Sequence, residues 1–474
     1  MASWGLLITS AFAAWAIVMA VVIVMQRRTP AATIAWMLVL AFLPGLGYVV
    51  YRLIGPQRLA RKKLRRQLTR KIIEEAVGAL HEIELESPMR HREQLAQIGI
   101  SAGEPPPLRA TTIDLYCDGR AKYEAVAAAI DAAKHHVHIE YYIWEPDHIG
   151  TRLRDQLIER ARAGIEVRVI LDGTGSHEAG RRFFKPLAAA GAEVVWFNPV
   201  SIFTLRRRRP DFRSHRKIVV CDGTVGFMGG MNVADVQTSE FTGDAAWRDT
   251  HVRIAGSTVR ALQRIFVEDW AYAADQVLPF GPPYFPLPTG EGGDVAQIVA
   301  SGPDLATFSV HKMYFAAINQ AAHRVWLTTP YFVPDEAILS AIVSAAMRGV
   351  DVRLIVPAKG DSRLVDLAAR SYFPEVLDAG ARLFEYTPRF IHAKTMVIDD
   401  DVAIVSSANL DNRSFRLDFE LASVIYGHTL NQQLADAFTR DLELCREVRS
   451  DALARQTFFP RLFQAGARLL SPLL

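Results

Sequence analysis

Two long apolar runs at the N-terminus dominate the pattern of hydrophobic and polar positions. Leu6–Met25 contains twenty residues without a charge, and Ala31–Tyr51 contains a further twenty-one. At about 1.5 Å per residue, either run as a helix can cross the roughly 30 Å of hydrocarbon in a bilayer. No basic segment precedes the first run and a second follows at once, which favours a transmembrane hairpin over a cleaved signal peptide. Pro44-Gly45 leaves a buried or re-entrant helix open as the alternative for the second run.

After about residue 107 the pattern changes to short apolar strands that alternate with helical segments, and it occurs twice. Val137–Asp147 and Val325–Asp335 each begin as an apolar run and end in Pro-Asp. A helical pattern follows each run, and a glycine (Gly164 or Gly349) then precedes a second apolar strand. Strand, helix and strand joined in this way form a βαβ unit. The sequence therefore predicts an α/β fold of two duplicated lobes.

Breaker residues place the domain boundaries. Pro105-Pro106-Pro107 precedes the first lobe, and a stretch rich in Pro and Gly over residues 279–293 separates the two halves. We expect a hairpin over residues 1–54, a basic juxtamembrane and helical linker over 55–106, a first lobe over 107–288 and a second lobe over 289–474. Within the linker, Ile72–Leu85 is predicted to be helical.

Charge is distributed very unevenly. The first 71 residues contain eleven Lys or Arg and no acidic residue, whereas the other 403 residues contain 43 basic and 51 acidic residues. An enzyme that acts on nucleic acid is expected to carry positive charge on its catalytic body, so no nucleic-acid partner is predicted. By the positive-inside rule the basic cluster stays in the cytoplasm, which predicts a multi-pass protein of the inner (cytoplasmic) membrane with its body on the cytoplasmic side. The cluster either lies on anionic headgroups of the lipid bilayer or acts only as a topology signal.

Two polar clusters with the same spacing carry the chemical signal. Each reads His-x-Lys-x4-Asp, followed by two small residues and an Asn, one in each half of the chain. The members are His215, Lys217, Asp222 and Asn232 in the first half, and His392, Lys394, Asp399 and Asn409 in the second. A single His and Lys on a strand would usually be solvent-exposed side chains without a function, but duplication at fixed spacing argues for function.

Strand geometry explains why His and Lys stand two apart. In an extended strand these side chains point to the same face, so each cluster presents an imidazole beside an ammonium. Such a pair suits attack on an anionic phosphate ester, because the Lys holds phosphate oxygens and the His supplies a nucleophile or a proton. With two clusters, one His can form a phosphohistidine while the other handles protons. No metal and no cofactor is needed, and the three cysteines (Cys117, Cys221 and Cys445) lack zinc-site spacing.

The paired motifs resemble those of the phospholipase D superfamily. Trp247–Asp249, Pro330–Asp335 and Asn409–Glu420 also match, and together with the N-terminal hairpin and its Ala35–Gly45 segment the whole chain is similar to the bacterial cardiolipin synthases. The resemblance implies two lobes about a pseudo-twofold axis, with both motifs in one cleft. It also implies phosphatidylglycerol and other phospholipids as substrates.

The resemblance assigns roles to individual residues. His215 corresponds to the nucleophile and His392 to the general acid and base. Asp249 and Glu420, one downstream of each motif, would orient the imidazoles through hydrogen bonds; ordinary salt bridges are the alternative. The predicted phosphate ligands are Lys217, Asn232, Lys394, Ser407 and Asn409. Asp222 and Asp399 are counted with the catalytic motifs, although structural support is the expected role of both, and Gly230 stands where many relatives have Ser.

The leading hypothesis is phosphatidyl transfer between two phosphatidylglycerol molecules, giving cardiolipin and glycerol. Phosphatidylethanolamine is an alternative second lipid. A membrane-anchored phospholipase D that hydrolyses lipid to phosphatidic acid, a nuclease, and a lipid-binding scaffold without activity are the other readings. Two weaker features are Arg206–Arg209, which would steer anionic lipid or form a solvated loop, and the apolar segment Phe458–Leu474, which would lie at the membrane surface or pack on the second lobe.

Overall fold

The computed structural model describes residues 2–26, 30–55, 60–77, 92–199, 211–276, 281–287, 293–305 and 307–474. The described residues form two compact units, of which the first contains the N-terminal helices and the second runs from residue 60 through almost all of the rest of the chain. The predicted lipid-steering segment Arg206–Arg209 lies outside the described residues, as does the Arg27-Arg28 connection between the apolar runs.

The described residues of the N-terminal unit form three helices, whereas the apolar runs predict two. The first run forms α1 (Ala2–Val24), whereas the second is divided into α2 (Pro30–Phe42) and α3 (Pro44–Ile54). The break falls at Pro44, which has no amide hydrogen to donate and whose ring restricts the residue before it. The prediction of one continuous second helix was therefore wrong.

The N-terminal unit has a small core and a large apolar surface. Its core contains Met19, Ile23, Leu40 and Tyr51, with Trp15 and Trp36 packed against them. Many other apolar side chains are exposed, among them Ile17, Val21, Met25, Leu38 and Phe42. Within the part of the chain that the structure describes, no helix is both long enough and apolar enough to cross a membrane.

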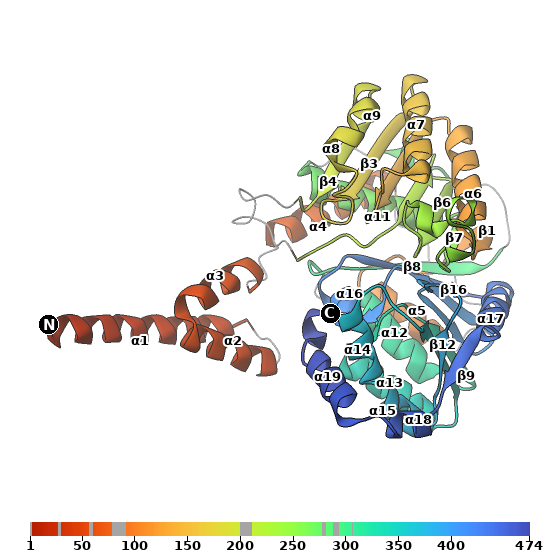
Figure 1. Ribbon diagram of the computed structural model, residues 1–474. Coiled ribbons are helices and arrows are strands. Elements are labelled where there is room, and N and C mark those ends of the chain that lie inside the picture. Colours follow the sequence, from red (N-terminus) through yellow and green to blue (C-terminus); the bar gives the residue numbers. More distant parts are fainter. Residues whose placement is uncertain are drawn as a thin grey trace. The chain divides into compact units, whose positions relative to one another are not determined.

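The body is built on one mixed sheet of 15 strands, which read β17-β12-β11-β9-β13-β14-β16-β8-β1-β7-β6-β5-β2-β3-β4 from edge to edge. Outward from the antiparallel β1–β8 pair, the order β1-β7-β6-β5-β2-β3-β4 on one side matches β8-β16-β14-β13-β9-β11-β12 on the other. This is the order that two duplicated lobes about a pseudo-twofold axis require. Figure 1 shows the lobes on either side of β8 and β16.

The first lobe follows the predicted alternation of strands and helices. Its elements are β1 (Leu108–Tyr116), α6 (Gly119–Ala132), β2 (His136–Tyr141), α7 (His148–Arg162), β3 (Glu166–Asp172), α8 (Gly180–Phe183), α9 (Lys185–Ala189), β4 (Glu193–Phe197), β5 (Ile218–Cys221), β6 (Val225–Gly229), α10 (Ser239–Thr242), β7 (His251–Gly256) and α11 (Val259–Ala274). The strands β2, β3 and β4 are parallel, as the βαβ pattern predicts.

The second lobe repeats this sequence of elements and adds a C-terminal extension. Its elements are β8 (Val295–Ser301), α12 (Ser309–Gln320), β9 (Arg324–Thr328), β10 (Phe332–Val333), α13 (Glu336–Met347), β11 (Asp351–Pro357), α14 (Arg363–Arg370), α15 (Phe373–Asp378), β12 (Arg382–Tyr386), β13 (Thr395–Ile398), β14 (Val402–Ser406), β15 (Leu410–Asp411), α16 (Asn412–Arg416), β16 (Glu420–Tyr426), α17 (His428–Leu442), β17 (Cys445–Val448), α18 (Ser450–Ala454) and α19 (Phe458–Arg468). The C-terminal helix α19 contacts α14, so this segment packs on the second lobe while its Phe458, Phe459, Leu462 and Phe463 remain exposed.

Helices cover both faces of the sheet. On one face α6 and α7 pack over β2 and β3 in the first lobe, and α12 and α13 pack over the equivalent strands in the second. On the other face α11 and α17 enclose a core shared by both lobes, which contains Ile218, Val252, Ile298, Val397 and Leu421. The two lobes therefore share buried apolar contacts, which fixes the central strands that carry the motifs.

Two helices of the predicted linker also belong to the body. They are α4 (Ala60–Val77), which packs on α11, and α5 (Glu93–Ser101), which packs on α12. Helix α4 begins twelve residues before the predicted start at Ile72, and the predicted stretch from residue 78 to 85 lies outside the described residues.

Candidate active site

The two His-x-Lys segments are extended and lie immediately before equivalent strands. His215 and Lys217 precede β5, and His392 and Lys394 precede β13. All four side chains are buried, with exposed fractions of 8%, 0%, 5% and 1% in that order. Each ammonium group donates to the backbone carbonyl of the His in its own segment, over 2.6 Å for Lys217. Charged groups buried this completely are rare unless a site is built around them.

Each imidazole is held by a carboxylate from the opposite lobe. Nδ1 of His215 lies 2.9 Å from Oε1 of Glu420, and Nδ1 of His392 lies 2.6 Å from Oδ2 of Asp249. The backbone crosses over in the same way, because His215 N donates to Phe419 O over 2.9 Å and His392 N donates to Arg248 O over 2.7 Å. The structure thus brings the two motifs into one site. The sequence identified both acids, but the pairing is crossed between the lobes.

These hydrogen bonds fix which nitrogen of each ring carries the proton. An ionised carboxylate can only accept, so Nδ1 of His215 and of His392 must donate. Each Nε2 then keeps its lone pair. An imidazole arranged like this can attack an electrophile or accept a proton from an alcohol.

Burial and charge together set the ionisation of the site. Burial lowers the pKa of His215 to about 4, although Glu420 acts in the opposite direction. Burial, with Lys394 beside it, likewise lowers the pKa of His392 to about 4 against the effect of Asp249. Burial also lowers the pKa of Lys217 to about 7 and that of Lys394 to about 8, because an ammonium loses hydration there.

For the pKa values of the two carboxylates, the nearby cationic groups together outweigh burial. Burial by itself raises the pKa of Glu420, but His215 and Lys217 bring it below its ordinary value. For Asp249 the opposing groups are His392 and Lys394, and they lower its pKa as well. Both acids are therefore ionised at neutral pH and available to orient the rings.

Comparison with known proteins shows which family the chain belongs to. A family model described as the cardiolipin synthase, PLD-like domain matches residues 126–270 and 314–442, and a second, the phospholipase D-nuclease N-terminal model, matches residues 14–56. Cardiolipin synthase 1 of Bacillus anthracis is 37% identical over 96% of this chain and 91% of its own length. Cardiolipin synthase of Alkalihalophilus pseudofirmus is 36% identical over the same shares of the two chains.

The chain belongs to the bacterial cardiolipin synthases of the phospholipase D superfamily. It is accordingly an enzyme of the phospholipase D type. The solved phosphatidylserine synthase of Haemophilus influenzae superimposes with a TM-score of 0.60 at 14% identity, covering 81% of this chain and 100% of the other. That likeness shows that the fold is shared, and both motifs of this chain fall within the matched family domains.

The two halves of the site differ where Ser407 stands in the second half and Gly230 in the first. In the second half the hydroxyl of Ser407 donates to Oε2 of Glu420, a partner different from the predicted phosphate. Gly230 occupies the equivalent place in the first half, where a Cβ atom would lie 2.2 Å from Oδ1 of Asp249. Asp249 instead accepts from the amide of Thr250 over 2.7 Å. The side chain is missing at Gly230 because the carboxylate occupies its space.

Replacement of Gly230 by Ala should therefore lower kcat by about 10-fold to 10²-fold. The added Cβ must displace Asp249, and a misplacement of about 1 Å at a positioning group has effects of that size. The steady-state rate with phosphatidylglycerol checks this. Gly466→Ala is the control, because a Cβ there has no neighbour within 4 Å. Wild-type kcat in Gly230→Ala would show that Asp249 does not need its present position.

The two motif aspartates lie at the other end of β5 and β13 from the motif His and Lys residues. Asp222 follows β5 and accepts from the amides of Lys134, His135 and His136, and Asp399 follows β13 and accepts from the amides of residues 322–324. Four strand residues separate each aspartate from its Lys. These contacts fit the structural role expected of Asp222 and Asp399, and a part for either residue in catalysis stays a prediction.

Both predicted Asn ligands are buried beside the site. Oδ1 of Asn232 accepts from the amide of Ile143 over 3.3 Å, which leaves only its NH2 group to donate. Asn409 is also buried, and its Oδ1 has no hydrogen-bond partner. Their contact with a phosphate group remains a prediction.

Aromatic rings enclose the two imidazoles. The Tyr142 ring lies 4.9 Å from the His215 ring, centroid to centroid, and Trp247 and Phe390 lie 5.3 and 5.8 Å from His392. Sequence reasoning did not assign Tyr142 or Phe390 to the site. Their positions in the sequence were the signal that pointed to the site. Phe390 stands two residues before His392, and Tyr142 lies in the apolar run that occurs in both halves.

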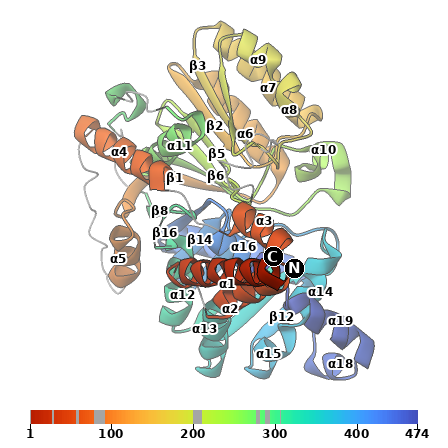
Figure 2. The same ribbon diagram turned by 90° about the vertical axis from the view of Figure 1, so that its left-hand side faces the viewer.

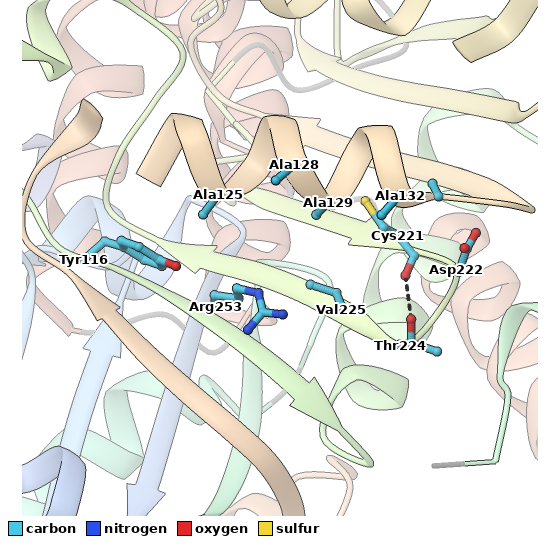
Figure 3. Close-up of a pocket in the computed structure, with 11 residues that line it drawn as sticks. Tyr116, Ala125, Ala128, Ala129, Ala132, Cys221, Asp222, Thr224, Val225 and Arg253 are labelled. Carbon is cyan, nitrogen blue, oxygen red and sulfur yellow. Dashed lines mark hydrogen bonds between the residues drawn. The ribbon is translucent and has the colours of Figure 1, made fainter. Parts of the chain in front are cut away.

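A separate cavity of about 320 Å³ lies in the first lobe. Figure 3 shows the alanine face of α6 (Ala125, Ala128, Ala129 and Ala132) over β5 and β6, with Arg253 and Tyr116 at one side. Neither imidazole nor either motif Lys lines it. This cavity is therefore not the catalytic cleft.

Proposed function

We propose that this protein joins two phosphatidylglycerol molecules into cardiolipin and releases glycerol, through a phosphohistidine intermediate. The crossed pairing of His215 with Glu420 and of His392 with Asp249 carries the proposal. It supplies two oriented imidazoles and two ammonium groups in one buried site, as transfer of a phosphoryl group in two steps requires. The relatives named cardiolipin synthase support this substrate class.

In the first step Nε2 of His215 attacks the phosphorus of one phosphatidylglycerol. The P–N bond forms as the P–O bond to glycerol breaks, and His392 gives its proton to the departing alkoxide. Binding of the anionic phosphodiester favours the protonated form of His392. Lys217 and Lys394 stabilise the charge that develops on the phosphoryl oxygens. Glycerol leaves, and the phosphatidyl group stays on His215.

In the second step a headgroup hydroxyl of another phosphatidylglycerol replaces the imidazole. His392, now neutral, takes the proton of that hydroxyl as its oxygen attacks phosphorus. The P–N bond breaks and His215 is regenerated. Burial of all four catalytic side chains supports transfer over hydrolysis, because water has little access to the intermediate.

Product analysis tests the proposal directly. Purified enzyme with phosphatidylglycerol should give cardiolipin and glycerol in equal amounts. Phospholipase D action would release the same glycerol, so the lipid product decides. Phosphatidic acid without cardiolipin would overturn transfer in favour of hydrolysis. Adding phosphatidylethanolamine to the same assay tests it as the phosphatidyl donor, since ethanolamine is released only when the phosphatidyl group of that lipid is transferred to phosphatidylglycerol.

The free enzyme should show a bell-shaped dependence of kcat/KM on pH. The nucleophile must be neutral, so activity rises as pH increases through about 4, the pKa of His215. His392 must carry a proton in the first step, so activity falls as pH increases above about 4, the pKa of His392, and it falls further through about 7 to 8, where Lys217 and Lys394 lose the charge that binds phosphate. Initial rates at low phosphatidylglycerol concentration measure both limbs. A kcat/KM that stays flat above pH 8 would contradict the role of the lysines.

We further propose that residues 1–54 anchor the enzyme in the bacterial inner membrane, with the body in the cytoplasm. The exposed apolar side chains of α1 and α2 support this, as do the basic residues that follow them. The full chain should stay in the membrane fraction after washes with high salt and alkaline carbonate, and dissolve in detergent. Release by salt alone would indicate an electrostatic attachment instead.

A further inference from the structure

The helix that follows the N-terminal unit contributes a buried arginine to the body. Arg66 of α4 is only 3% exposed, although the sequence groups it with residues expected at lipid headgroups or in a topology signal. Its Nε lies 3.0 Å from Oδ2 of Asp304, and its NH2 group donates to Oδ1 of Asp269 on α11. Figure 2 shows α4 lying along α11. Arg66 thus makes its charged contacts inside the protein.

Asp269 joins this helix to the first catalytic motif. Its Oδ1 accepts from Arg66, and its Oδ2 accepts from the guanidinium of Arg216. Arg216 is the middle residue of the first His-x-Lys segment, between His215 and Lys217. The side chains of Asp269 and Arg216 are fully buried. One carboxylate therefore connects the juxtamembrane helix with the segment that carries the nucleophile.

Arg216 in turn holds the second lobe. Its Nε donates to the carbonyl of Glu420 over 3.1 Å, and its NH2 group donates to the carbonyl of Ser301 over 3.0 Å. The side chain of Glu420 is the one that orients His215. The contacts run without a gap from Arg66 through Asp269 and Arg216 to Glu420 and the reacting ring.

The surrounding charges balance only when α4 is in place. Four guanidinium groups meet four carboxylates in this cluster. They are Arg66, Arg70, Arg216 and Arg264, against Glu104, Glu268, Asp269 and Asp304. A fifth buried carboxyl, that of Glu140, has its pKa raised well above the ordinary value by burial and by the neighbouring Asp269. Two of the four arginines come from α4. Without Arg66, Asp269 keeps a single cationic partner and Asp304 loses the guanidinium beside it. A buried carboxylate without enough cationic partners is destabilised, so it binds the remaining donors more closely.

We propose that Arg66 is a positioning residue for phosphoryl transfer: by sharing Asp269 with Arg216 it keeps Arg216 on Glu420, and so keeps His215 in its reactive orientation. Among the described residues, loss of Arg66 leaves Arg216 as the one guanidinium on Asp269, beside the hydrogen bond that Asp269 shares with Glu140. Arg216 is then drawn toward α11 and away from the Glu420 carbonyl. Activity consequently depends on the docking of the helix that follows the membrane unit.

This inference rests on the proposed function, and a single-turnover measurement tests it. Full-length enzyme is mixed with phosphatidylglycerol carrying labelled phosphorus, and the labelled protein is quantified over time. Arg66→Gln should form the intermediate roughly 10²-fold more slowly, the scale of a small misplacement, while the final labelled fraction is unchanged. A purely structural role would lower the labelled fraction and leave the rate per folded site unchanged, which would overturn the proposal.

Lys71→Gln is the matched control. Lys71 lies on the same helix, is exposed, and belongs to the same basic cluster. Its replacement removes an equal charge and should leave the labelling rate unchanged. Equal losses in Lys71→Gln and Arg66→Gln would place the effect at the lipid surface and overturn the proposal. If the wild-type enzyme forms no labelled intermediate, the proposed function fails and not this inference alone.

Two further variants keep the test decisive if Arg66→Gln does not fold. The double variant Arg66→Gln with Asp304→Asn removes one charge of each sign, so the cluster stays balanced while Asp269 still loses its partner. It should label slowly as well. Arg66→Lys keeps the charge, so it should become labelled more slowly than the wild type but faster than Arg66→Gln and the double variant. A folded double variant with the wild-type rate would overturn the proposal.

Discussion

Replacing His215 with Ala should abolish formation of the covalent intermediate and lower kcat by roughly 10⁵-fold to 10⁶-fold, the scale found when a nucleophile or its base is removed from a hydrolase. His392→Ala should reduce turnover of phosphatidylglycerol severely, because its glycerol leaving group needs a proton. The two histidines can be separated with a phosphatidyl ester of nitrophenol. Nitrophenolate leaves without a proton, so His392→Ala should still become labelled on that substrate, whereas His215→Ala should not.

His177→Ala serves as the control for this pair, because His177 is exposed and lies outside the site. It should retain wild-type turnover of both substrates. If His215→Ala releases nitrophenol and accumulates label at the wild-type rate, His215 is not the nucleophile. If His392→Ala alone fails to label, the two roles are exchanged between the lobes.

The second large effect is expected from the crossed pairing of acid and imidazole. Glu420→Gln and Asp249→Asn should each lower kcat by roughly 10²-fold to 10⁴-fold, because an amide can donate to Nδ1 and so favours the wrong tautomer. Their effects on the nitrophenyl substrate should differ. Glu420→Gln acts on His215 and should slow labelling, whereas Asp249→Asn acts on His392 and should leave labelling nearly unchanged.

This pair of variants distinguishes crossed from uncrossed pairing. If each acid served the His of its own lobe, Asp249→Asn would slow labelling and Glu420→Gln would spare it. Gln and Asn have nearly the volume of the acids they replace, so the packing around the rings is preserved. Melting temperatures close to that of the wild type are the check on folding.

Local pattern predicted the components of the site but not how they pair. The spacing of His215 and Lys217 follows from strand alternation, and duplication identified His392 and Lys394 as their equivalents. The partner of each imidazole depends on the central β1–β8 pairing and on the crossing of the segments before β5 and β13. These contacts join residues more than 140 positions apart, and no short-range rule encodes them.

The same separation along the sequence explains why the role of Arg66 could not be predicted. In the sequence it is one of eleven basic residues in a stretch without acidic residues, and its partners Asp269 and Asp304 lie more than 200 residues away. Hydropathy also treated Ala31–Tyr51 as one run, because Pro44 has little effect on mean hydropathy. The backbone consequence of Pro44 is local and steric, and it divided the run into α2 and α3.

Mapping the trapped intermediate tests the central claim, that imidazoles from both lobes act on one phosphorus with His215 as the nucleophile. Wild-type enzyme is quenched in alkali during a single turnover with phosphatidylglycerol, while the intermediate is present, and is then digested and examined by mass spectrometry. We expect a phosphorus adduct on the peptide that contains His215 and none on the peptide that contains His392. An adduct on His392, or cardiolipin formation at the full rate with no adduct on any histidine, would contradict it.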